Sequence, residues 1–191
     1  MKILALELSS ARGSLAVVSN GNVEVVRDWE NDRKNSGPFF ESLVEVQKQF
    51  GEPDTIIVGV GPGSYAGTRI AISAAIGLQT ASQARLVGFP SICAMECDES
   101  EFCVIGDARR QTFFFARIRE NNLAEGPMLM SEAELREKMD KLDRKMSIFG
   151  NAATRLKIST ASSSTAPIRP IPVSTLKLID IFPIRSKASA S

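Results

Sequence analysis

The amino-acid sequence predicts an α/β protein in which a small antiparallel meander continues into parallel strands connected by helices. Three observations predict this class. Short apolar runs of strand length alternate with longer stretches of helical periodicity. An Asn-Gly pair separates two of the first runs, and a loop rich in glycine and proline joins a buried run to a helical stretch. The 191 residues suffice for one large domain or two small lobes.

Three strands are expected at the beginning of the chain. Ile3–Leu8 and Ser14–Val18 are two apolar runs of strand length. Asn20-Gly21 lies between the second run and Val23–Trp29. This pair is typical of a two-residue hairpin turn, because both of its positions need a positive φ. We therefore expect an antiparallel meander.

Two helices and two further strands follow the meander. Pro38 can open a helix that Gly51 ends. Thr55–Val60 is rich in β-branched residues and predicts a buried strand. A helix over Gly67–Ser82 and a strand over Leu86–Phe89 complete the order βββαβα. That order is typical of a ribonuclease-H-like half, in which a meander joins parallel strands through helices.

The second part of the chain begins in a similar way. Phe102–Ile105 and Thr112–Ile118 predict two strands, and Ser131 with Glu134 predicts a capped helix start. Ile148–Gly150 predicts a last core strand. Serine, threonine, alanine and then proline dominate the next stretch of the chain, a composition typical of a linker or a surface loop. The expected organisation is an N-terminal lobe over 1–98, a reduced second lobe over 99–158, a Ser/Pro-rich linker or loop over 159–172 and a C-terminal segment over 173–191.

The side-chain inventory excludes several kinds of chemistry. The chain has no histidine, so it cannot form a Ser-His-Asp or Cys-His nucleophile or a histidine metal site from its own residues. Its 23 basic and 22 acidic side chains nearly cancel, which argues against a nucleic-acid clamp or a membrane-surface binder. Cys93, Cys97 and Cys103 lack the paired spacing of a structural zinc site and favour ordinary thiols. With no signal-peptide core or membrane span, we expect a reduced cytoplasmic protein.

One loop, which reads GPGSYAG over residues 61–67, is the most informative local feature. The free N–H groups of a helix that follows such a loop can hold a phosphate. The sequence lacks the ending of a P-loop and the carboxylate of a dinucleotide fingerprint, so a phosphate contact and a purely structural turn both remain open. Glu7, at the end of the first strand, could bind a magnesium-bound water. Asp107 and Arg109 could contact a ligand or form an ion pair within their turn.

Each helix expected in the first lobe has two notable faces, and only one of them is needed to cover the sheet. In the first helix, one apolar stripe contains Phe39 and Leu43 and a second contains Phe40 and Val44, and only one stripe can cover the sheet. In the second helix small residues share one face, and Gly77 there costs roughly 1 kcal/mol relative to alanine, so a close contact is expected. Packing inside one domain and a helix-to-helix partner surface both explain these faces.

Four segments together resemble one protein family. They read ILALELSS, GVGPGSYAGTRIAISAAIGL, VGFPSICAM and DARRQTFFFA, and they are similar to the bacterial TsaB (YeaZ) family of tRNA threonylcarbamoyladenosine biosynthesis proteins. The resemblance covers about residues 1–120. It implies the actin/Hsp70-like ATPase (ASKHA) fold, with two ribonuclease-H-like lobes around a cleft and, in this chain, a shortened second lobe.

The resemblance also implies a role without catalysis. The family member is a scaffold subunit required for threonylcarbamoyladenosine formation at position 37 of tRNA. It activates the catalytic paralogue TsaD, which carries a histidine metal site, by helix-mediated dimerisation. TsaE, an ATPase, joins the assembly. We expect a homodimer when the chain is alone, an indirect relation to tRNA and no membrane partner.

Two groups of site residues follow from the resemblance, with no catalytic or metal-binding residue among them. The implied partner surface comprises Phe39, Phe40, Leu43, Val44, Gln47, Ile70, Ser73, Ala74, Gly77, Thr80 and Ala81. The implied vestigial nucleotide cleft comprises Glu7, Ser9, Ser10, Gly61, Gly63, Ser64, Asp107 and Arg109. Glu7 stands where the family generally has aspartate. No cofactor is required for the scaffold role, although the cleft could hold ATP or ADP with magnesium.

Two other classes of function stay open. The chain could be an ATPase or a small-molecule phosphotransferase that uses Glu7 and Asp107 around magnesium, with the 61–67 loop nearby. Magnesium-dependent ATP turnover by the isolated chain would separate this class from a scaffold. Direct RNA binding through the basic segment after residue 150 is a third class, and a steep salt dependence of tRNA binding would indicate it.

Overall fold

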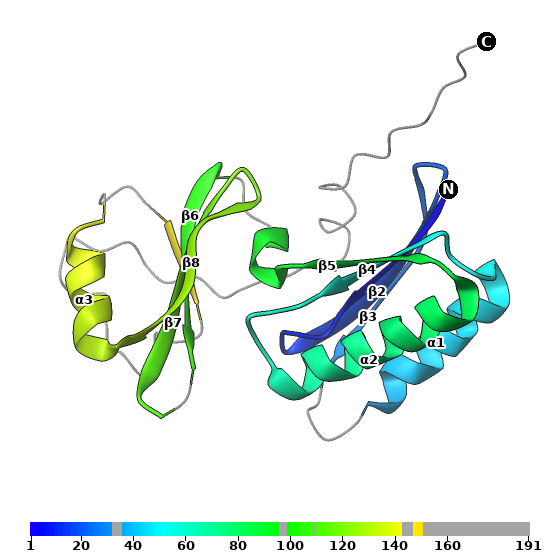
Figure 1. The fold of residues 1–191 in the computed structure, drawn as a ribbon, viewed down its shortest axis with the longest axis horizontal. Helices are drawn as coiled ribbons and strands as arrows, with labels where there is room; N and C mark the ends of the chain where they lie inside the picture. The colour runs from blue at the N-terminus through cyan, green and yellow to red at the C-terminus, as the bar shows by residue number, and fades with distance from the viewer. Residues whose placement is uncertain (32–35, 96–98, 109, 143–146, 151–191) are drawn as a thin grey trace, which may run out of the picture. The chain divides into compact units, whose positions relative to one another are not determined.

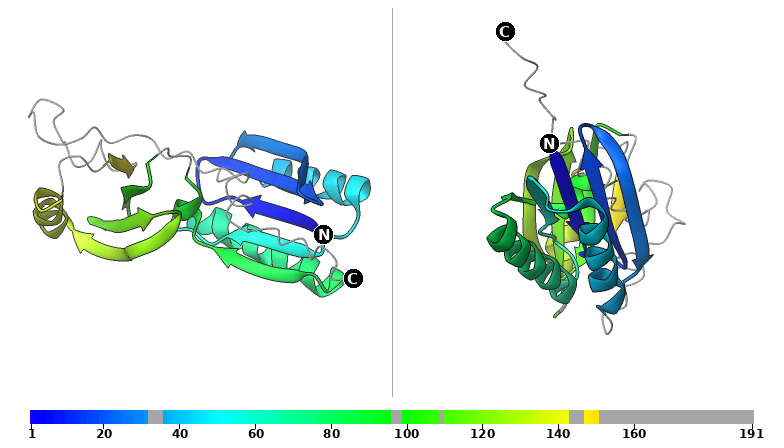
Figure 2. Two further views of the ribbon diagram at one scale, coloured as in Figure 1. Left: turned by 90° about the horizontal axis from the view of Figure 1, so that it is seen from above. Right: turned by 90° about the vertical axis from the view of Figure 1, so that its right-hand side faces the viewer.

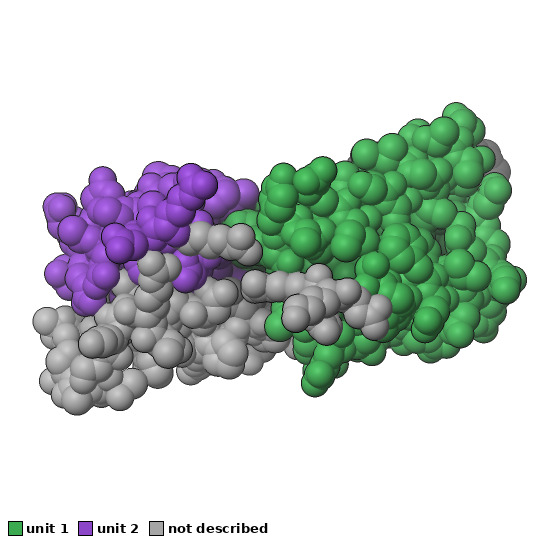
Figure 3. Space-filling view, turned by 90° about the horizontal axis from the view of Figure 1, so that it is seen from below, with its two compact units in different colours: residues 1–94, 173–191 green, residues 95–172 purple. Residues whose placement is uncertain are grey.

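The computed structural model describes residues 1–31, 36–95, 99–108 and 110–142 together with the backbone of 147–150. They belong to two compact units, one that contains Met1–Ala94 and one that begins at Met95 (Figure 3). The expected lobe boundary after residue 98 adjoins residues 96–98, which lie outside the described part. The expected linker over 159–172 and C-terminal segment over 173–191 also lie outside it.

The first unit is built on a five-stranded sheet in the order β3-β2-β1-β4-β5 (Figure 1). Its strands are β1 Lys2–Glu7, β2 Arg12–Ser19, β3 Asn22–Glu30, β4 Thr55–Gly59 and β5 Arg85–Phe89. Strands β1, β2 and β3 pair antiparallel, whereas β4 pairs parallel with both β1 and β5. The expected meander and its continuation into parallel strands are confirmed.

The turn between β2 and β3 confirms the Asn-Gly prediction. Asn20 has a φ of 50° and Gly21 a φ of 89°, so both central residues adopt the left-handed conformation. This conformation matches the right-handed twist of the two strands that the turn connects.

Two helices cover one face of this sheet, as Figures 1 and 2 show. Helix α1, Gly37–Phe50, has proline in its first turn and ends at Gly51, whose φ is 70°. Helix α2, Tyr65–Ser82, begins two residues earlier than expected, because the Ser64 hydroxyl caps it by accepting a hydrogen bond from the backbone N–H of Gly67 at 3.3 Å.

The alternation of strand side chains divides the apolar core of the unit between the two faces of the sheet. On the helical face, Leu4, Leu6, Leu15, Val17, Ile56 and Val58 pack with the inner sides of α1 and α2. On the opposite face, Ile3, Ala5, Ala16, Val18 and Ile57 pack with Ala94 of the short helix η1, Ser91–Ala94.

The second unit repeats the start of the first. Strands β6 Glu101–Asp107, β7 Thr112–Arg119, β8 Asn122–Ser131 and β9 Ser147–Gly150 form a sheet in the order β8-β7-β6-β9. The pairs β6–β7 and β7–β8 are antiparallel and β6–β9 is parallel, as in β3-β2-β1-β4. Helix α3, Glu132–Asp140, lies between β8 and β9 in the chain, just as α1 lies between β3 and β4. Both units are thus ribonuclease-H-like, and the described part of the second has one strand fewer.

Strand β8 is the element that the sequence analysis missed. Gly126-Pro127 lies in its middle and looks like a break, and the turn before it, Glu120-Asn121, has positive φ at both positions without a glycine. Half-buried and exposed side chains alternate along β8, and that alternation was the available signal. The predicted strand at 148–150 and the predicted capping box of α3 are both confirmed.

Candidate functional site

Helix α1 buries one of its two apolar stripes. Phe39 is fully buried, Leu43 is 5% exposed, and both belong to the core between the helices and the sheet. Phe40 and Val44 are 46% and 47% exposed, and Gln47 is half-buried. Phe39 and Leu43, which the resemblance placed in a partner surface, therefore belong to the unit's own core, because the first stripe is the one that faces the sheet.

Helix α2 also has a buried side and an open side. Gly67, Ala71 and Ala75 face the core. Among the expected surface residues, Ile70 and Ala74 are half-buried, and the exposed ones are Ser73, Gly77, Thr80 and Ala81. A β-carbon added to Gly77 would have no atom within 4 Å. The small residues of this face therefore leave open space, and nothing in the described part of the chain fills it.

Two exposed residues of α2 were missed by the sequence analysis. Ile76 is 50% exposed and Tyr65 is 72% exposed. Ile76 lies three residues after Ser73, on the same helical face, so the helical spacing was the signal that could have found it. Tyr65 stacks with Arg69, whose guanidinium lies 5.2 Å from the centre of the ring.

We give the name outer helix surface to a set of exposed apolar and small residues on the two helices. It consists of Phe40, Val44, Ile76, Gly77, Ser73, Thr80 and Ala81. Both helices lie on the same face of the sheet, so these side chains belong to one layer of the unit (Figure 2). Scattered exposed apolar residues are normal, but a set gathered on two adjacent helices is typical of a protein-binding surface.

The glycine-rich loop before α2 is occupied by the protein's own groups. Ser64 N donates to the carbonyl of Ser9 at 2.6 Å, and Gly61 N donates to the Ser91 hydroxyl at 3.0 Å. A β-carbon on Gly63 would lie 2.2 Å from the Ser9 carbonyl oxygen, and one on Gly67 would lie 2.0 Å from that of Leu8. The glycines are therefore required for close packing against the chain that leaves β1, which supports the structural turn.

Glu7 ends β1 and points into the protein. Its side chain is fully buried, and Oε1 accepts a hydrogen bond from Ser9 N at 2.6 Å. Oε2 is buried without a partner in hydrogen-bonding geometry, although the Ser9 and Ser91 side chains lie near enough to influence its titration. Burial raises the pKa of Glu7 above its ordinary value, and the hydrogen bonds of Ser9 and Ser91 oppose that rise.

The structure brings together only part of the implied nucleotide cleft. Glu7, Ser9, Gly61, Gly63 and Ser64 form one contact network in the first unit. Ser10 turns away, and its hydroxyl donates to the carbonyl of Arg12 at 2.7 Å. Asp107 ends β6 in the second unit, and Arg109 lies outside the described residues.

This network does not fit magnesium, and three of its backbone N–H groups are already bonded within the protein. A magnesium ligand needs a carboxylate oxygen that faces water or substrate, whereas the Glu7 carboxyl is enclosed. A phosphate cradle needs several backbone N–H groups that point outward, and three of those near the loop, in Gly61, Ser64 and Gly67, donate to the protein's own oxygens instead. Nucleotide binding by the chain stays a prediction from the resemblance, and the described loop does not add to it.

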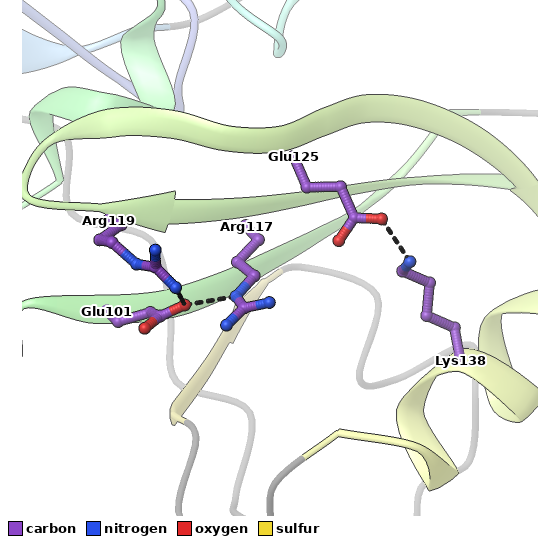
Figure 4. Close-up of polar contacts among 5 residues, drawn as sticks. All are labelled: Glu101, Arg117, Arg119, Glu125 and Lys138. Carbon is purple, nitrogen blue, oxygen red and sulfur yellow. Dashed lines mark hydrogen bonds and ion pairs between the residues drawn. The ribbon is translucent and has the colours of Figure 1, made fainter.

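The second unit carries a set of ion pairs on its sheet (Figure 4). Glu101 pairs with both Arg117 and Arg119, and Glu125 pairs with Lys138 of α3. A hollow of about 340 Å³ nearby is lined by Arg117, Glu125, Glu134, Glu137, Lys138, Lys141 and Leu142. Its basic side chains already bind carboxylates, so the hollow offers no net charge to attract a ligand.

Two of the three cysteines lie in the described part of the chain. Cys93 and Cys103 are buried, and burial raises the pKa of each thiol to about 11. Both are therefore protonated near neutral pH, and Cys97 lies outside the described residues.

Within the part of the chain that the structure describes, no helix combines the length and the hydropathy that a membrane span needs.

Two ribonuclease-H-like units in one chain define the class of protein, which is that of the actin/Hsp70-like (ASKHA) fold. Solved structures of similar fold agree with this assignment. YeaZ from Pseudomonas aeruginosa has a TM-score of 0.73 at 17% identity, with 95% of this chain and 90% of that chain covered. A Pseudomonas aeruginosa protein described as similar to the peptidase YeaZ has a TM-score of 0.72 at 18% identity over 94% and 90%. The AlfA filament structure from B. subtilis plasmid pLS32 has a TM-score of 0.52 at 6% identity over 95% and 99%.

The sequence comparison identifies the family. The model of the family TsaD, described as tRNA N6-adenosine threonylcarbamoyltransferase, matches residues 34–177, more than half of the chain, and the chain belongs to this family. No curated protein matches it in sequence. The YeaZ-like fold and the family membership confirm the resemblance drawn from the sequence motifs, and they indicate a role related to tRNA modification.

Proposed function

We propose that this chain is a non-catalytic subunit of the machinery that forms threonylcarbamoyladenosine at position 37 of tRNA. In this role it activates the catalytic TsaD paralogue by dimerising through the outer helix surface. The observation that carries the proposal is that α1 and α2 expose apolar side chains on the layer that faces away from their own sheet.

The chemistry of the chain favours a subunit without catalysis. The whole sequence contains no histidine, so the histidine metal site that the resemblance assigns to TsaD cannot be formed here. The carboxyl at the end of β1 is enclosed, and the neighbouring backbone N–H groups of Gly61 and Ser64 are bonded within the protein. These features support a role in which the family fold is kept for binding, and we propose no cofactor for it.

The outer helix surface suits a helix-to-helix contact. Phe40, Val44 and Ile76 supply apolar area, and the open space over Gly77 lets a second helix approach closely. A stable interface of ordinary size buries about 1,600 Å² in total. We expect the half-buried neighbours Gln47, Ile70 and Ala74 to form its edge.

The other proposed partners follow from the same surface for a second copy and from the family resemblance for TsaE and tRNA. Alone, the chain would pair with a second copy through the outer helix surface, because exposed apolar area is unfavourable in water. TsaE would join the TsaD-bound assembly, and tRNA would be held by TsaD. We expect the assembly in the cytoplasm.

The decisive experiment is copurification with the cognate TsaD, followed by a tRNA modification assay with and without this chain. We expect a stable complex, and threonylcarbamoyladenosine formation that depends on the chain. Magnesium-dependent ATP turnover by the isolated chain that is lost in Glu7→Ala would instead support the phosphotransferase alternative.

A substitution on the outer helix surface tests its location. Val44→Asp should weaken TsaD binding by roughly thirtyfold or more, because burying an unpaired carboxylate costs about 2 kcal/mol or more. Val23→Asp is the matched control, since Val23 is similarly exposed on β3 but lies outside the surface. Equal binding by both variants in a calorimetric titration would contradict the proposed interface.

A further inference from the structure

A chain of hydrogen bonds connects Glu7 to the start of α2. The Ser9 backbone N–H donates to Glu7 Oε1 at 2.6 Å, and the Ser9 carbonyl accepts from Ser64 N at 2.6 Å. Ser64 is the N-cap of α2, and its hydroxyl accepts from Gly67 N. The carboxyl therefore fixes the short segment on which the first turn of α2 is built.

A second connection runs through η1 to the other end of the loop. Gly61 N donates to the Ser91 hydroxyl at 3.0 Å, and Ser91 N donates to the Gly61 carbonyl at 2.9 Å. Ser91 Oγ and Glu7 Oε2 both pack over Gly59, since a β-carbon there would lie 2.7 Å from the first and 1.9 Å from the second. Both ends of the loop 61–64 are thus held by groups that contact Glu7 directly or across Gly59.

The cross-strand neighbour of Glu7, Ser14, lies in the same enclosed region, although its hydroxyl has no hydrogen-bond partner among the described residues. Ser14 pairs with Glu7 in the β1–β2 ladder, and Ser14 and Ser91 are both buried. Polar groups enclosed in this way are costly unless they bond to one another or fix a particular geometry. Hydrogen bonds and the contact over Gly59 connect Glu7, Ser9, Ser64 and Ser91, so these four residues form a structural joint between the end of β1, the loop 61–64 and η1.

We propose that Glu7 is a positioning residue, a buried carboxyl that ties the end of β1 to the loop 61–64 and to η1 and thereby sets where α2 begins. The scaffold role does not require this joint. The proposal gives Glu7 a structural role that differs from binding magnesium. Its consequence for partner binding rests on the proposed function, because α2 carries half of the outer helix surface.

Amide hydrogen exchange of the isolated chain, followed residue by residue by NMR, tests the joint without any partner. Glu7→Met keeps the length of the side chain but cannot accept the Ser9 hydrogen bond. We expect the amides of Ser9 and Ser64 to exchange roughly tenfold faster or more in Glu7→Met. Glu7→Gln, which keeps both an acceptor and a donor, should restore their protection.

Two further variants make the result specific. Ser91→Ala removes the acceptor of Gly61 N and the hydroxyl that lies beside Glu7 Oε2. The Gly61 amide should therefore exchange faster, while that of Ser9, which bonds to Oε1, stays protected. Ser82→Ala is the matched control, because its hydroxyl bonds at the opposite end of α2 and should leave all three amides unchanged. If Glu7→Met does not fold, the exchange of the Gly61 amide in Ser91→Ala and of the Ser9 and Ser64 amides in Glu7→Gln would still decide whether the joint exists.

Unchanged protection of Ser9 and Ser64 in a folded Glu7→Met chain, or of Gly61 in Ser91→Ala, would overturn the proposal. TsaD binding is a separate readout. If Val44→Asp leaves TsaD binding intact while Glu7→Met releases the loop amides, the partner proposal fails and the joint stands.

Discussion

Gly67 and Gly77 lie in the same helix, yet a methyl group added to each would meet different surroundings. At Gly67 the new β-carbon would lie 2.0 Å from the Leu8 carbonyl oxygen, which is backbone and cannot rotate away. At Gly77 it would meet open space. The same residue type thus serves close packing at one position and leaves room at the other.

The two glycines therefore make a matched pair of variants. Gly67→Ala should lower the free energy of unfolding by roughly 1–3 kcal/mol, because the loop and the end of β1 must separate. Gly77→Ala should raise it by roughly 0.5–1 kcal/mol, because alanine is the better helix former. Urea unfolding of the isolated chain measures both, and a stabilising Gly67→Ala would show that the contact with Leu8 is looser than described.

Glu7 should make stability depend on pH in the direction opposite to that of most carboxyls. Its pKa is raised in the folded chain, so its contribution is fully present below the pKa of the unfolded state and is lost as pH rises through the folded pKa. The groups that act on it, in Ser9, Ser91 and Leu8, are uncharged. Relative to the wild-type chain, Glu7→Gln should therefore gain stability as pH rises.

Thermal unfolding of both proteins across the pH range measures this difference. The comparison cancels the other carboxyls, including Glu101, whose pKa is lowered mainly by the hydrogen bond from Arg119, and Glu134, whose pKa is lowered by Ser131. A difference between Glu7→Gln and wild type that does not change with pH would mean that Glu7 titrates as an ordinary glutamate.

At the scale of single elements, helix α3 depends on its first residues. It has only nine residues and buries Leu135 alone among its side chains. Ser131 and Glu134 bond reciprocally to each other's backbone N–H groups and form a complete capping box. A short helix with one buried anchor relies on such local bonds more than a long helix does.

Ser131→Ala should destabilise the second unit by about 1 kcal/mol, because the N–H of Glu134 loses its acceptor. Ser131→Asp, which keeps an acceptor at the cap, is the control and should cost much less. Circular dichroism with urea unfolding measures both variants, and equal stability of Ser131→Ala and wild type would show that packing on β7 and β8 alone holds α3 in place.

For the whole molecule, the second unit repeats the order of four strands of the first, but the two units differ in their helical layer. The first covers its sheet with fourteen-residue α1 and eighteen-residue α2, whereas the described part of the second has only nine-residue α3. The outer helix surface is consequently a property of the first unit. This difference supports a division in which the first unit supplies the partner contact.

Gly77→Glu tests that division in solution. A charged side chain in the open space over α2 should prevent both self-association and TsaD binding, while the exposed position leaves the fold intact. Light scattering at increasing protein concentration measures the first effect, and copurification measures the second. Retained TsaD binding by Gly77→Glu would place the contact elsewhere on the molecule.

Much of the fold was available from local patterns. Four predictions that depend on neighbouring residues were confirmed: the antiparallel meander that continues into parallel strands, the Asn20-Gly21 turn, the capping box and the family motifs. Strand β8 was missed because Gly126-Pro127 in its middle resembles a break in the sequence. In the structure, hydrogen bonding to β7 keeps the strand continuous across this pair. The turn that joins the two strands, Glu120-Asn121, lacks a glycine, so the hairpin had no strong local turn signal either.

The sequence by itself determined that the chain is α/β, lacks histidine chemistry and resembles the TsaB (YeaZ) family. Only the tertiary structure decided that Phe39 and Leu43 are core residues whereas Phe40 and Val44 are open, and that Glu7 points inward. The physical reason is that helical spacing shows which residues share a face, whereas burial depends on which segments, remote in sequence, pack against that face.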